Sequence, residues 1–437
     1  MKHIDRQILQ IALPSIVSNI TVPLLGLIDV AIVGHLGSPA YIGAIAVGGM
    51  LFNIIYWIFG FLRMGTSGMT SQAYGKRDLP EIVRLLMRSV GIGLAVALCL
   101  IQLQVPIRQA AFLIIHPTAE VREMATLYFH ICIWGAPAML GLYGLSGWFI
   151  GMQNSRIPMY IAITQNIVNI IASLSFVCFF KMKVEGVAFG TLIAQYAGFI
   201  MGLVLWMSRY GKLKKYILWK GVLQKEAMMR FFQVNRDIFL RTLCLVTVTL
   251  FFTSAGASQG EIILAVNTLL MQLFTLFSYV MDGFAYAGEA LSGRYIGARN
   301  RKAFTNTTRH LFIWGGWLAA FFTLVYALGG NAFLGLLTDN KDVVSAAGTY
   351  FYWALAIPVA GIAAFIWDGI FIGATATRGM LASMAIAAIS FFVVYYGLRP
   401  VLGNHALWLA FLVYLAMRGV VQTLLSPKII KENFTQP

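Results

Sequence analysis

Charged side chains are scarce in this chain of 437 residues. Asp, Glu, Lys and Arg together make up 11% of it, and apolar types make up 59%. An ordinary soluble domain is about 25% charged, so there are too few ionic side chains here to cover a globule of this size. Disorder is excluded as well, because disordered segments are poor in apolar residues. The mean hydropathy of +0.79 agrees, and the composition indicates a membrane protein with several spans.

Acidic residues are the scarcer of the two signs, with 16 Asp and Glu against 32 Lys and Arg, which gives a net charge of +16. In a soluble protein this excess would suggest a nucleic-acid partner. In a membrane protein, basic residues instead gather in the loops on the cytoplasmic side. The position of the basic residues along the chain therefore decides between the two interpretations.

Cysteines and enzyme motifs are also few or missing. The four cysteines lie in apolar runs without CxxC spacing, so we expect small core residues and no disulfide or metal site. The sequence contains no P-loop, GxSxG or HExxH motif. We therefore expect no enzyme activity, no cofactor and no ATP-driven pump in this chain, which leaves ion-coupled transport as the natural energy source.

Long apolar runs are what the sequence has in abundance. A helix needs about 20 apolar residues to cross a bilayer. Twelve runs are long enough, and no small-residue cleavage site follows the N-terminus, so we expect the first helix to be retained. The predicted fold is an all-α integral membrane protein whose spans cover residues 8–33, 41–70, 82–104, 124–151, 157–180, 186–207, 238–257, 262–291, 304–328, 344–374, 380–398 and 406–425.

Basic residues alternate between the connectors of these spans. The longest connector, 208–235, carries seven Lys and Arg, and the other loops and termini expected on its side carry most of the remainder. This asymmetry predicts a multi-pass protein of the bacterial cytoplasmic membrane with both termini in the cytoplasm. The net charge then reports orientation, and we expect the lipid bilayer and no nucleic acid as a partner.

An internal repeat relates the two halves of the chain. The segment Gly147–Gly151 resembles Gly369–Gly373, which lies 222 residues later, and the same offset pairs Arg77 with Arg299. Such parallel repeats in transporters are related by a pseudo-two-fold axis along the membrane normal. We therefore expect two six-helix bundles: an N-terminal lobe (1–207), a cytoplasmic basic linker (208–235) and a C-terminal lobe (236–437).

Asp29 is the most conspicuous ionisable residue within a predicted span. A charge at mid-bilayer costs about 2.5–3.5 kcal/mol on insertion scales, so such residues usually face an interior cavity. Pro23 and Gly26 precede Asp29, and a proline bends a helix. We interpret Asp29 as a group that takes and releases a proton or coordinates Na⁺; a hydrated structural carboxylate near the helix end is the alternative.

Four other ionisable residues in the spans are secondary candidates. Arg63 keeps its charge, and a structural ion pair is as good an interpretation as a functional role. Asp282 and Glu289 are seven residues apart, which places them on one helix face. Asp368 occupies the position of Ser146 in the repeat. A C-terminal cation site and a structural polar network both remain open for these carboxylates.

Neutral polar residues cluster in the fifth and sixth spans. Asn166 and Asn169 share a helix face, with Gln165 beside them and Ser173 one turn further on, and Thr191 follows in the next span. Amides and hydroxyls between membrane helices are often only packing contacts. Together with Asp29 they could instead form a hydrogen-bonded acid site.

The chain resembles the multidrug and toxic compound extrusion (MATE) family, and within it the DNA-damage-inducible F (DinF) branch. The resemblance covers essentially the whole chain. It rests on the twelve spans in two bundles and on a set of short motifs: Pro14 and Asp29 in the first span, Phe61–Thr66 and Gln72–Gly75 in the second, Asp282–Ala285 and Gly288–Ala290 in the eighth, and Asp368–Gly369 with Phe371–Gly373 in the tenth.

The resemblance implies export of organic cations or other amphipathic compounds, driven by inward flow of H⁺ or Na⁺. It implies a cation site in the N-terminal lobe at Asp29, Asn169 and Thr191, with Ser146 as the polar residue of the fourth span. The branch usually has an Asp where this chain has Ser173, and the loss of one anionic ligand favours proton coupling over Na⁺.

The predicted function is therefore a monomeric secondary antiporter that works by alternating access through protonation of Asp29. The runner-up is a lipid-linked precursor flippase of the same superfamily, against which the twelve spans and the few basic residues within them argue. A membrane enzyme acting on lipids is disfavoured, because His130 is the one His well inside a span and no motif surrounds it.

Overall fold

The computed structural model describes residues 2–435, and its regular secondary structure is entirely helical. Short 3₁₀ turns cover Ile133–Gly135 and Gly211–Tyr216. The α-helices are α1 (Lys2–Gly34), α2 (Pro39–Ile58), α3 (Phe61–Lys76), α4 (Leu79–Gln102), α5 (Gln104–Ile115), α6 (Ala119–Cys132), α7 (Ala136–Gly151), α8 (Arg156–Cys178), α9 (Val184–Tyr210), α10 (Lys225–Ala257), α11 (Glu261–Gly297), α12 (Arg301–Leu337), α13 (Lys341–Gly373), α14 (Thr377–Leu402) and α15 (Asn404–Phe434).

Twelve stretches of the described chain are long and apolar enough to cross a membrane, which confirms the predicted spans. Two of them are built from two helices each, because α2 continues into α3 and α6 into α7 after short breaks. The short apolar helix α5 lies between the third and fourth spans. Pro106 stands in its first turn, where a proline ends the preceding run of helical hydrogen bonds. In the second half of the chain, the single helix α12 covers the equivalent length without a break.

The chain divides into two compact units, Val17–Asn235 (the N-terminal unit) and Met1–Ile16 with Arg236–Pro437 (the C-terminal unit). This division differs from the expected lobe boundaries at both ends. The first half of α1 belongs to the C-terminal unit, where Tyr295 Oη donates to Gln7 Oε1 over 2.7 Å and His310 Nδ1 lies 2.9 Å from Asp5 Oδ1. The basic linker belongs to the N-terminal unit. Met1, Gln436 and Pro437, which the expected lobes include, lie outside the described residues.

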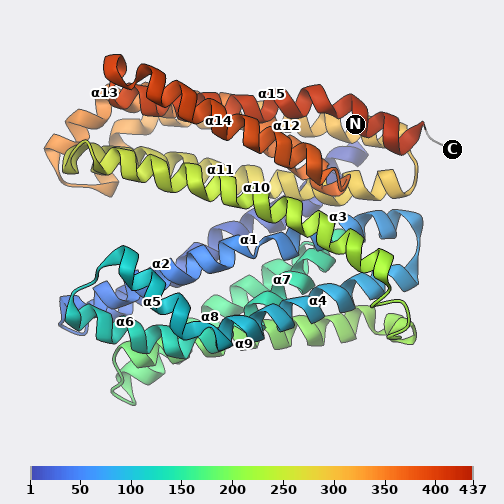
Figure 1. The fold of residues 1–437 in the computed structure, drawn as a ribbon, viewed down its shortest axis with the longest axis horizontal. Helices are drawn as coiled ribbons and strands as arrows, with labels where there is room; N and C mark the ends of the chain where they lie inside the picture. The colour runs from blue at the N-terminus through green and yellow to red at the C-terminus, as the bar shows by residue number, and fades with distance from the viewer. Residues whose placement is uncertain (1, 436–437) are drawn as a thin grey trace. The chain divides into compact units, whose positions relative to one another are not determined.

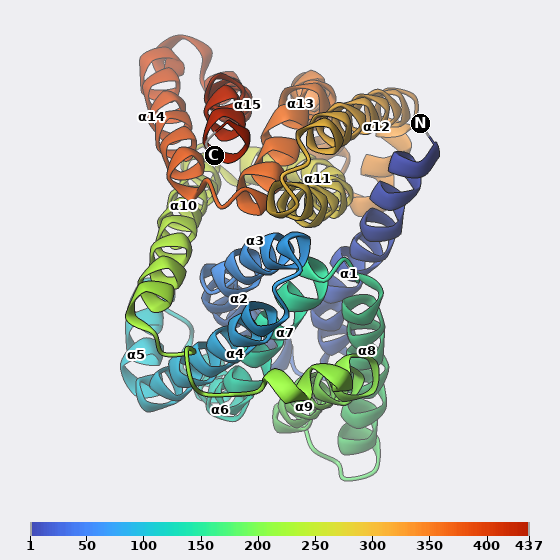
Figure 2. The ribbon, with the colours of Figure 1, turned by 90° about the vertical axis from the view of Figure 1, so that its right-hand side faces the viewer.

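Each unit is a bundle of paired helices (Figure 1). In the N-terminal unit, α3 and α4 pack on α7, and α8 packs along α9; in the C-terminal unit, α11 packs on α13 and α14 along α15. The pairs α8–α9 and α14–α15 run side by side in both views (Figure 2). Membrane helices associate through close backbone approach at small residues, and α7 and α13 supply such residues as glycines.

The repeat at 222 residues is visible in the caps of the helices. Arg77 ends α3 with φ 58°, and Arg299 follows α11 with φ 53°. The next residue of each half, Asp78 or Asn300, accepts a hydrogen bond from the backbone N–H three residues further on, at 3.2 and 3.0 Å. Positive φ angles recur at the same offset in two further pairs: Gln153 with Thr375, and Lys181 with Gly403. The two halves therefore share their turns as well as their glycines.

Gly147 and Gly369 make the closest helix contacts equivalent in the two units. A Cβ on Gly147 would collide with the Arg63 carbonyl oxygen of α3, and one on Gly369 with the Ala285 carbonyl oxygen of α11. We predict that Gly147→Ala or Gly369→Ala lowers the free energy of unfolding by about 1–3 kcal/mol, because overpacking forces the helices apart. Thermal unfolding of the purified protein in detergent measures this.

The matched control is Gly91→Ala in α4, since a Cβ there would meet nothing within 4 Å. Its melting temperature should stay the same or rise, because alanine is the better helix former. Equal melting of all three variants would contradict the predicted role of the glycine contacts.

Candidate functional site

Asp29 lies in α1 of the N-terminal unit and is only 3% exposed. Its two carboxylate oxygens each accept one hydrogen bond from a neighbouring helix. Asn169 Nδ2 of α8 donates to Oδ1 over 2.9 Å, and Thr191 Oγ1 of α9 donates to Oδ2 over 2.9 Å. Residues from three helices, predicted from the sequence to act together, therefore meet around one buried carboxylate.

Ser173 orients the amide that faces Asp29. Its Oγ donates to Asn169 Oδ1 over 3.1 Å. Because the amide oxygen is thereby held, the Nδ2 group of Asn169 is directed to the carboxylate. Gly190 was not predicted from the sequence, and it allows this packing, because a Cβ there would collide with Ser173 Oγ. Asp29, Asn169, Ser173 and Thr191 are called the Asp29 group below.

The Asp29 group holds a carboxylate by neutral donors alone. None of the ion pairs formed within residues 2–435 includes Asp29. A buried carboxylate without a cationic partner is costly, and it is normally neutralised by a proton or a bound cation. Two hydrogen bonds stabilise the ionised form while burial favours the neutral form. The arrangement is therefore suited to exchange of a proton or a small cation.

Gln165 and Asn166 lie on the same helix pair but outside the Asp29 group. Asn166 Nδ2 donates to the backbone oxygens of Thr21 at 3.0 Å and Ala162 at 3.1 Å, so it ties α8 to α1 two turns before Asp29. The buried Gln165 side chain packs where a Cβ on Gly198 would stand. Within the described chain, Ser146 of α7 makes no hydrogen bond to the Asp29 group, although the sequence places it among the site residues.

The other secondary candidates are distributed between the units. Arg63 is half-buried in α3, and its backbone oxygen faces Gly147. Asp282 and Glu289 both lie in α11 of the C-terminal unit, where Glu289 is buried and Asp282 half-buried. The charge of Asp282 also acts on Arg418 of α15. None of these residues has a recorded hydrogen bond to the Asp29 group.

Asp368 is the centre of a buried ionic network in the C-terminal unit. Arg241 Nη2 of α10 lies 2.5 Å from Asp368 Oδ2, and Arg418 Nη2 of α15 donates to the same oxygen. Gln422 Nε2 donates to Oδ1 over 2.6 Å. A second cation at Asp368 would compete with two permanently charged guanidinium groups. The geometry therefore favours a structural network over a cation site at this carboxylate.

Arg241 and Arg418 escaped the sequence analysis, although each lies within a predicted span. The cost of a buried charge that singled out Arg63 applies equally to them. That signal would have found both residues, but it would not have shown that Asp368 is their common partner.

The C-terminal unit carries aromatic rings where the N-terminal unit carries the acid. At the place along α10 that corresponds to Asp29 stand Phe251 and Phe252, and the repeat offset turns Asn169 and Ser173 into Phe391 and Tyr395. The Phe251 ring lies 5.9 Å from that of Phe391 and 5.3 Å from that of Tyr395, both edge to face. The fold therefore forms this helix contact without any polar group, and the Asp29 group is not required for folding as such.

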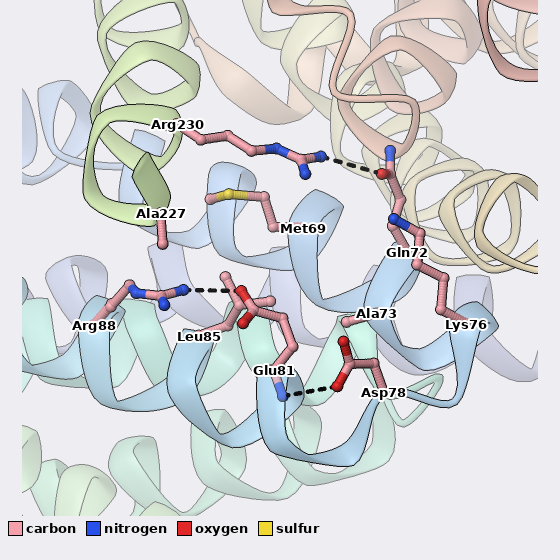
Figure 3. A pocket seen from close by; sticks show the side chains of 10 residues that line it. All are labelled: Met69, Gln72, Ala73, Lys76, Asp78, Glu81, Leu85, Arg88, Ala227 and Arg230. Atoms are coloured by element: carbon pink, nitrogen blue, oxygen red, sulfur yellow. Dashed lines mark hydrogen bonds and ion pairs between the residues drawn. The ribbon is translucent and has the colours of Figure 1, made fainter. Parts of the chain in front are cut away.

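A pocket in the N-terminal unit is separate from the Asp29 group (Figure 3). It lies between α3, α4 and the start of α10, and its charged side chains are paired with one another. Arg88 Nη1 donates to Glu81 Oε1 over 2.9 Å, and Arg230 Nη2 donates to Gln72 Oε1 over 3.4 Å. Asp78 caps α4 by accepting from the Glu81 N–H. This pairing indicates a structural connection between α4 and the start of α10.

Comparison with known proteins gives matches over both halves. The MatE family model matches residues 14–174 and 238–398. The chain is 39% identical to the DNA damage-inducible protein F of Escherichia coli (strain K12), over 95% of this chain and 90% of that protein. It is also 23% identical to the protein DETOXIFICATION 44, chloroplastic, of Arabidopsis thaliana, over 95% of this chain and 81% of that protein.

Solved structures agree in fold. The crystal structure of MATE in the bent conformation has a TM-score of 0.90 at 18% identity, and the alignment covers 99% of this chain and 97% of that one. At this identity the likeness shows the twelve-helix fold alone.

The Asp368 network gives a stability prediction. Asp368→Asn should lower the free energy of unfolding by about 3–5 kcal/mol, because it leaves Arg241 and Arg418 as buried charges without their carboxylate. Asp342→Asn in the exposed first turn of the same helix is the control and should cost at most about 1 kcal/mol. Thermal unfolding in detergent compares them, and equal losses would argue against a network that holds α10, α13 and α15 together.

Proposed function

Since the chain belongs to the MATE family, whose members are transporters and not enzymes, we propose that it is a secondary antiporter that exports organic cations or other amphipathic compounds in exchange for protons. The observation that carries this proposal is the Asp29 carboxylate, buried among neutral hydrogen-bond donors without a cationic partner. Small organic substrates are what MATE transporters handle, and a buried acid supplies a site where a proton and a cationic substrate compete.

The proposed coupling uses the protonation state of Asp29 to change the hydrogen bonds that hold α1. When the carrier faces outward, Asp29 takes a proton on one carboxylate oxygen. A neutral carboxyl group accepts the hydrogen bonds of Asn169 and Thr191 more weakly than a carboxylate does. α1 is then freer to bend near Pro23, the N-terminal cavity changes shape, and substrate is released. The empty protonated carrier returns inward-facing and gives the proton to the cytoplasm.

The proton is favoured over Na⁺ by the chemistry of the Asp29 group. Hard cations such as Na⁺ favour several oxygen ligands with anionic character. The Asp29 group contains one carboxylate, and its other members offer amide and hydroxyl oxygens. Ser173 stands where the DinF branch usually has a second acid. No cofactor takes part in this scheme, and the carrier is proposed to act as a monomer.

The membrane and the orientation follow from charge. The basic linker and its companion loops place both termini in the cytoplasm of a bacterial cell, with the spans in its inner membrane. The alternative of a lipid-linked precursor flippase would use a cationic cavity to bind a pyrophosphate. The two buried arginines of the C-terminal unit are instead bound to Asp368, which supports the antiporter over the flippase.

Asp29→Asn tests the coupling residue. We expect export of a fluorescent organic cation from reconstituted vesicles to fall to the level of protein-free vesicles, since an amide cannot exchange the proton. Asp339→Asn changes an exposed acid between α12 and α13 and should leave export unchanged. Thermal unfolding shows whether the Asp29 variant is folded; a folded variant with normal export would refute the role of Asp29.

Separate ion gradients test the coupling ion. In vesicles that contain the wild-type protein, an imposed pH gradient should drive substrate movement in the absence of Na⁺. A Na⁺ gradient at uniform pH should drive none. Transport that follows the Na⁺ gradient alone would overturn proton coupling while leaving the antiporter itself in place.

A further inference from the structure

The connection between α9 and α10 carries an uncompensated positive charge. Four of its lysines are fully exposed: Lys212, Lys214, Lys215 and Lys220. No Asp or Glu occurs between Ser208 and Gln224. These side chains therefore form a one-signed surface on the N-terminal unit, which attracts a polyanionic partner.

Large apolar side chains stand exposed among these lysines. Trp219 is 74% exposed and Leu223 is 71% exposed, and Ile217 and Leu218 are exposed as well. A run of apolar side chains directed outward is unfavourable in water. Tryptophan beside lysine is typical of segments at the membrane–water interface, where the ring sits at headgroup level and the ammonium group reaches the aqueous side.

Arg88 holds this segment in place. Its side chain is buried in α4, and it donates to two backbone oxygens of the connection, Nε to Val222 and Nη2 to Gly221, each over 2.8 Å. Val222 is turned inward, with 2% exposure, and Gly221 has a φ of +86° that suits glycine. The turn thus points Val222 into the unit while its neighbours Trp219 and Leu223 stay outside. The exposed face is fixed by the fold and is not a loose loop.

The position of the segment suits a membrane surface. Its 3₁₀ turn, Gly211–Tyr216, contacts α4 and α9, which belong to membrane-spanning stretches. Lys225, two residues after Leu223, begins α10. The segment therefore lies where membrane helices end, at the depth of the lipid headgroups.

We propose that Lys212, Lys214, Lys215, Ile217, Leu218, Trp219, Lys220 and Leu223, the linker surface, bind the anionic phospholipids of the inner leaflet. The lysines bind the phosphate headgroups, and the Trp219 ring and the aliphatic side chains enter the interface. The proposal rests on the cytoplasmic placement of the linker but on neither the substrate nor the coupling ion of the transporter. Lipid bound here holds the start of α10, the helix that leads from the N-terminal unit into the C-terminal unit.

The direct test is quenching of Trp219 by brominated lipid. The full-length protein is placed in phosphatidylcholine nanodiscs that contain a minor fraction of phosphatidylglycerol, and either lipid carries the bromine. The emission of Trp219 is the difference between wild type and Trp219→Phe. Bromine on phosphatidylglycerol should quench this emission more than its share of the lipid predicts, and added salt should reduce the excess.

Neutralising the lysines tests the source of the preference. A variant with all four lysines of the linker surface changed to Gln should lose the excess quenching, with affinity for the anionic lipid falling about fivefold per lysine removed. The matched control changes four exposed basic residues of the opposite loops to Gln: Arg122, Lys181, Lys183 and Lys341. It should keep the preference. All eight positions are exposed, and thermal unfolding checks that both variants are folded.

Three results would overturn the proposal. Trp219 emission that neither lipid quenches would mean that water, another protein or a second copy of the chain meets this surface. Equal quenching by both lipids, relative to their amounts, would mean that no anion is recognised. A control variant that loses the preference as completely as the linker variant would assign the effect to overall charge. Export activity enters none of these readouts, so failure here leaves the antiporter proposal untouched.

Discussion

A charge placed among apolar helices has to be compensated, and this constraint organises the polar interior of both units. The C-terminal unit meets it with opposite charge, since Asp368 is bound by Arg241 and Arg418. In the N-terminal unit, Arg88 meets it with two backbone carbonyls and Glu81. Asp29 is the exception, because only an amide and a hydroxyl serve it. The residue whose charge is least compensated by the fold is the one that has most to gain from a mobile cation.

The repeat explains why this exception is informative. Both halves use the same glycine contacts and the same helix caps, so the scaffold of each unit is equivalent. At the place of the Asp29 group, the second half has Phe251, Phe391 and Tyr395 in edge-to-face contact. An apolar solution to this helix contact therefore exists within the same chain. The retention of an acid in one half alone is understandable if the acid has a task other than packing.

Much of the fold was predictable because each span is a local property of the sequence. The twelve spans follow from apolar runs, and the offset of 222 residues follows from motifs read directly along the chain. The Asp29 group was also assembled from the sequence, but through family resemblance and not through spacing. Asp29 lies 140 residues from Asn169 and 162 from Thr191, and no local pattern connects positions so far apart.

What the sequence did not reveal were partners and boundaries that depend on packing in three dimensions. Arg241 and Arg418 were missed as a pair because their common partner, Asp368, lies 127 and 50 residues away. Gly190 looked like any other glycine of a membrane helix until Ser173 was found where its Cβ would stand. The unit boundaries were placed in the connector, yet the structure puts them inside α1 and α10, since side-chain contacts and not loops define a compact unit.

Those two boundaries have a mechanical consequence. α1 and α10 each run without a break through the point at which the chain passes from one unit to the other. A loop at such a point would act as a free swivel, whereas a continuous helix resists bending and twisting because its hydrogen bonds must distort. Two helical struts remove most of the degrees of freedom that two tethered bodies would otherwise have. Movement of one unit against the other is then restricted to a few elastic modes, and energy stored by bending either strut is available to drive the return.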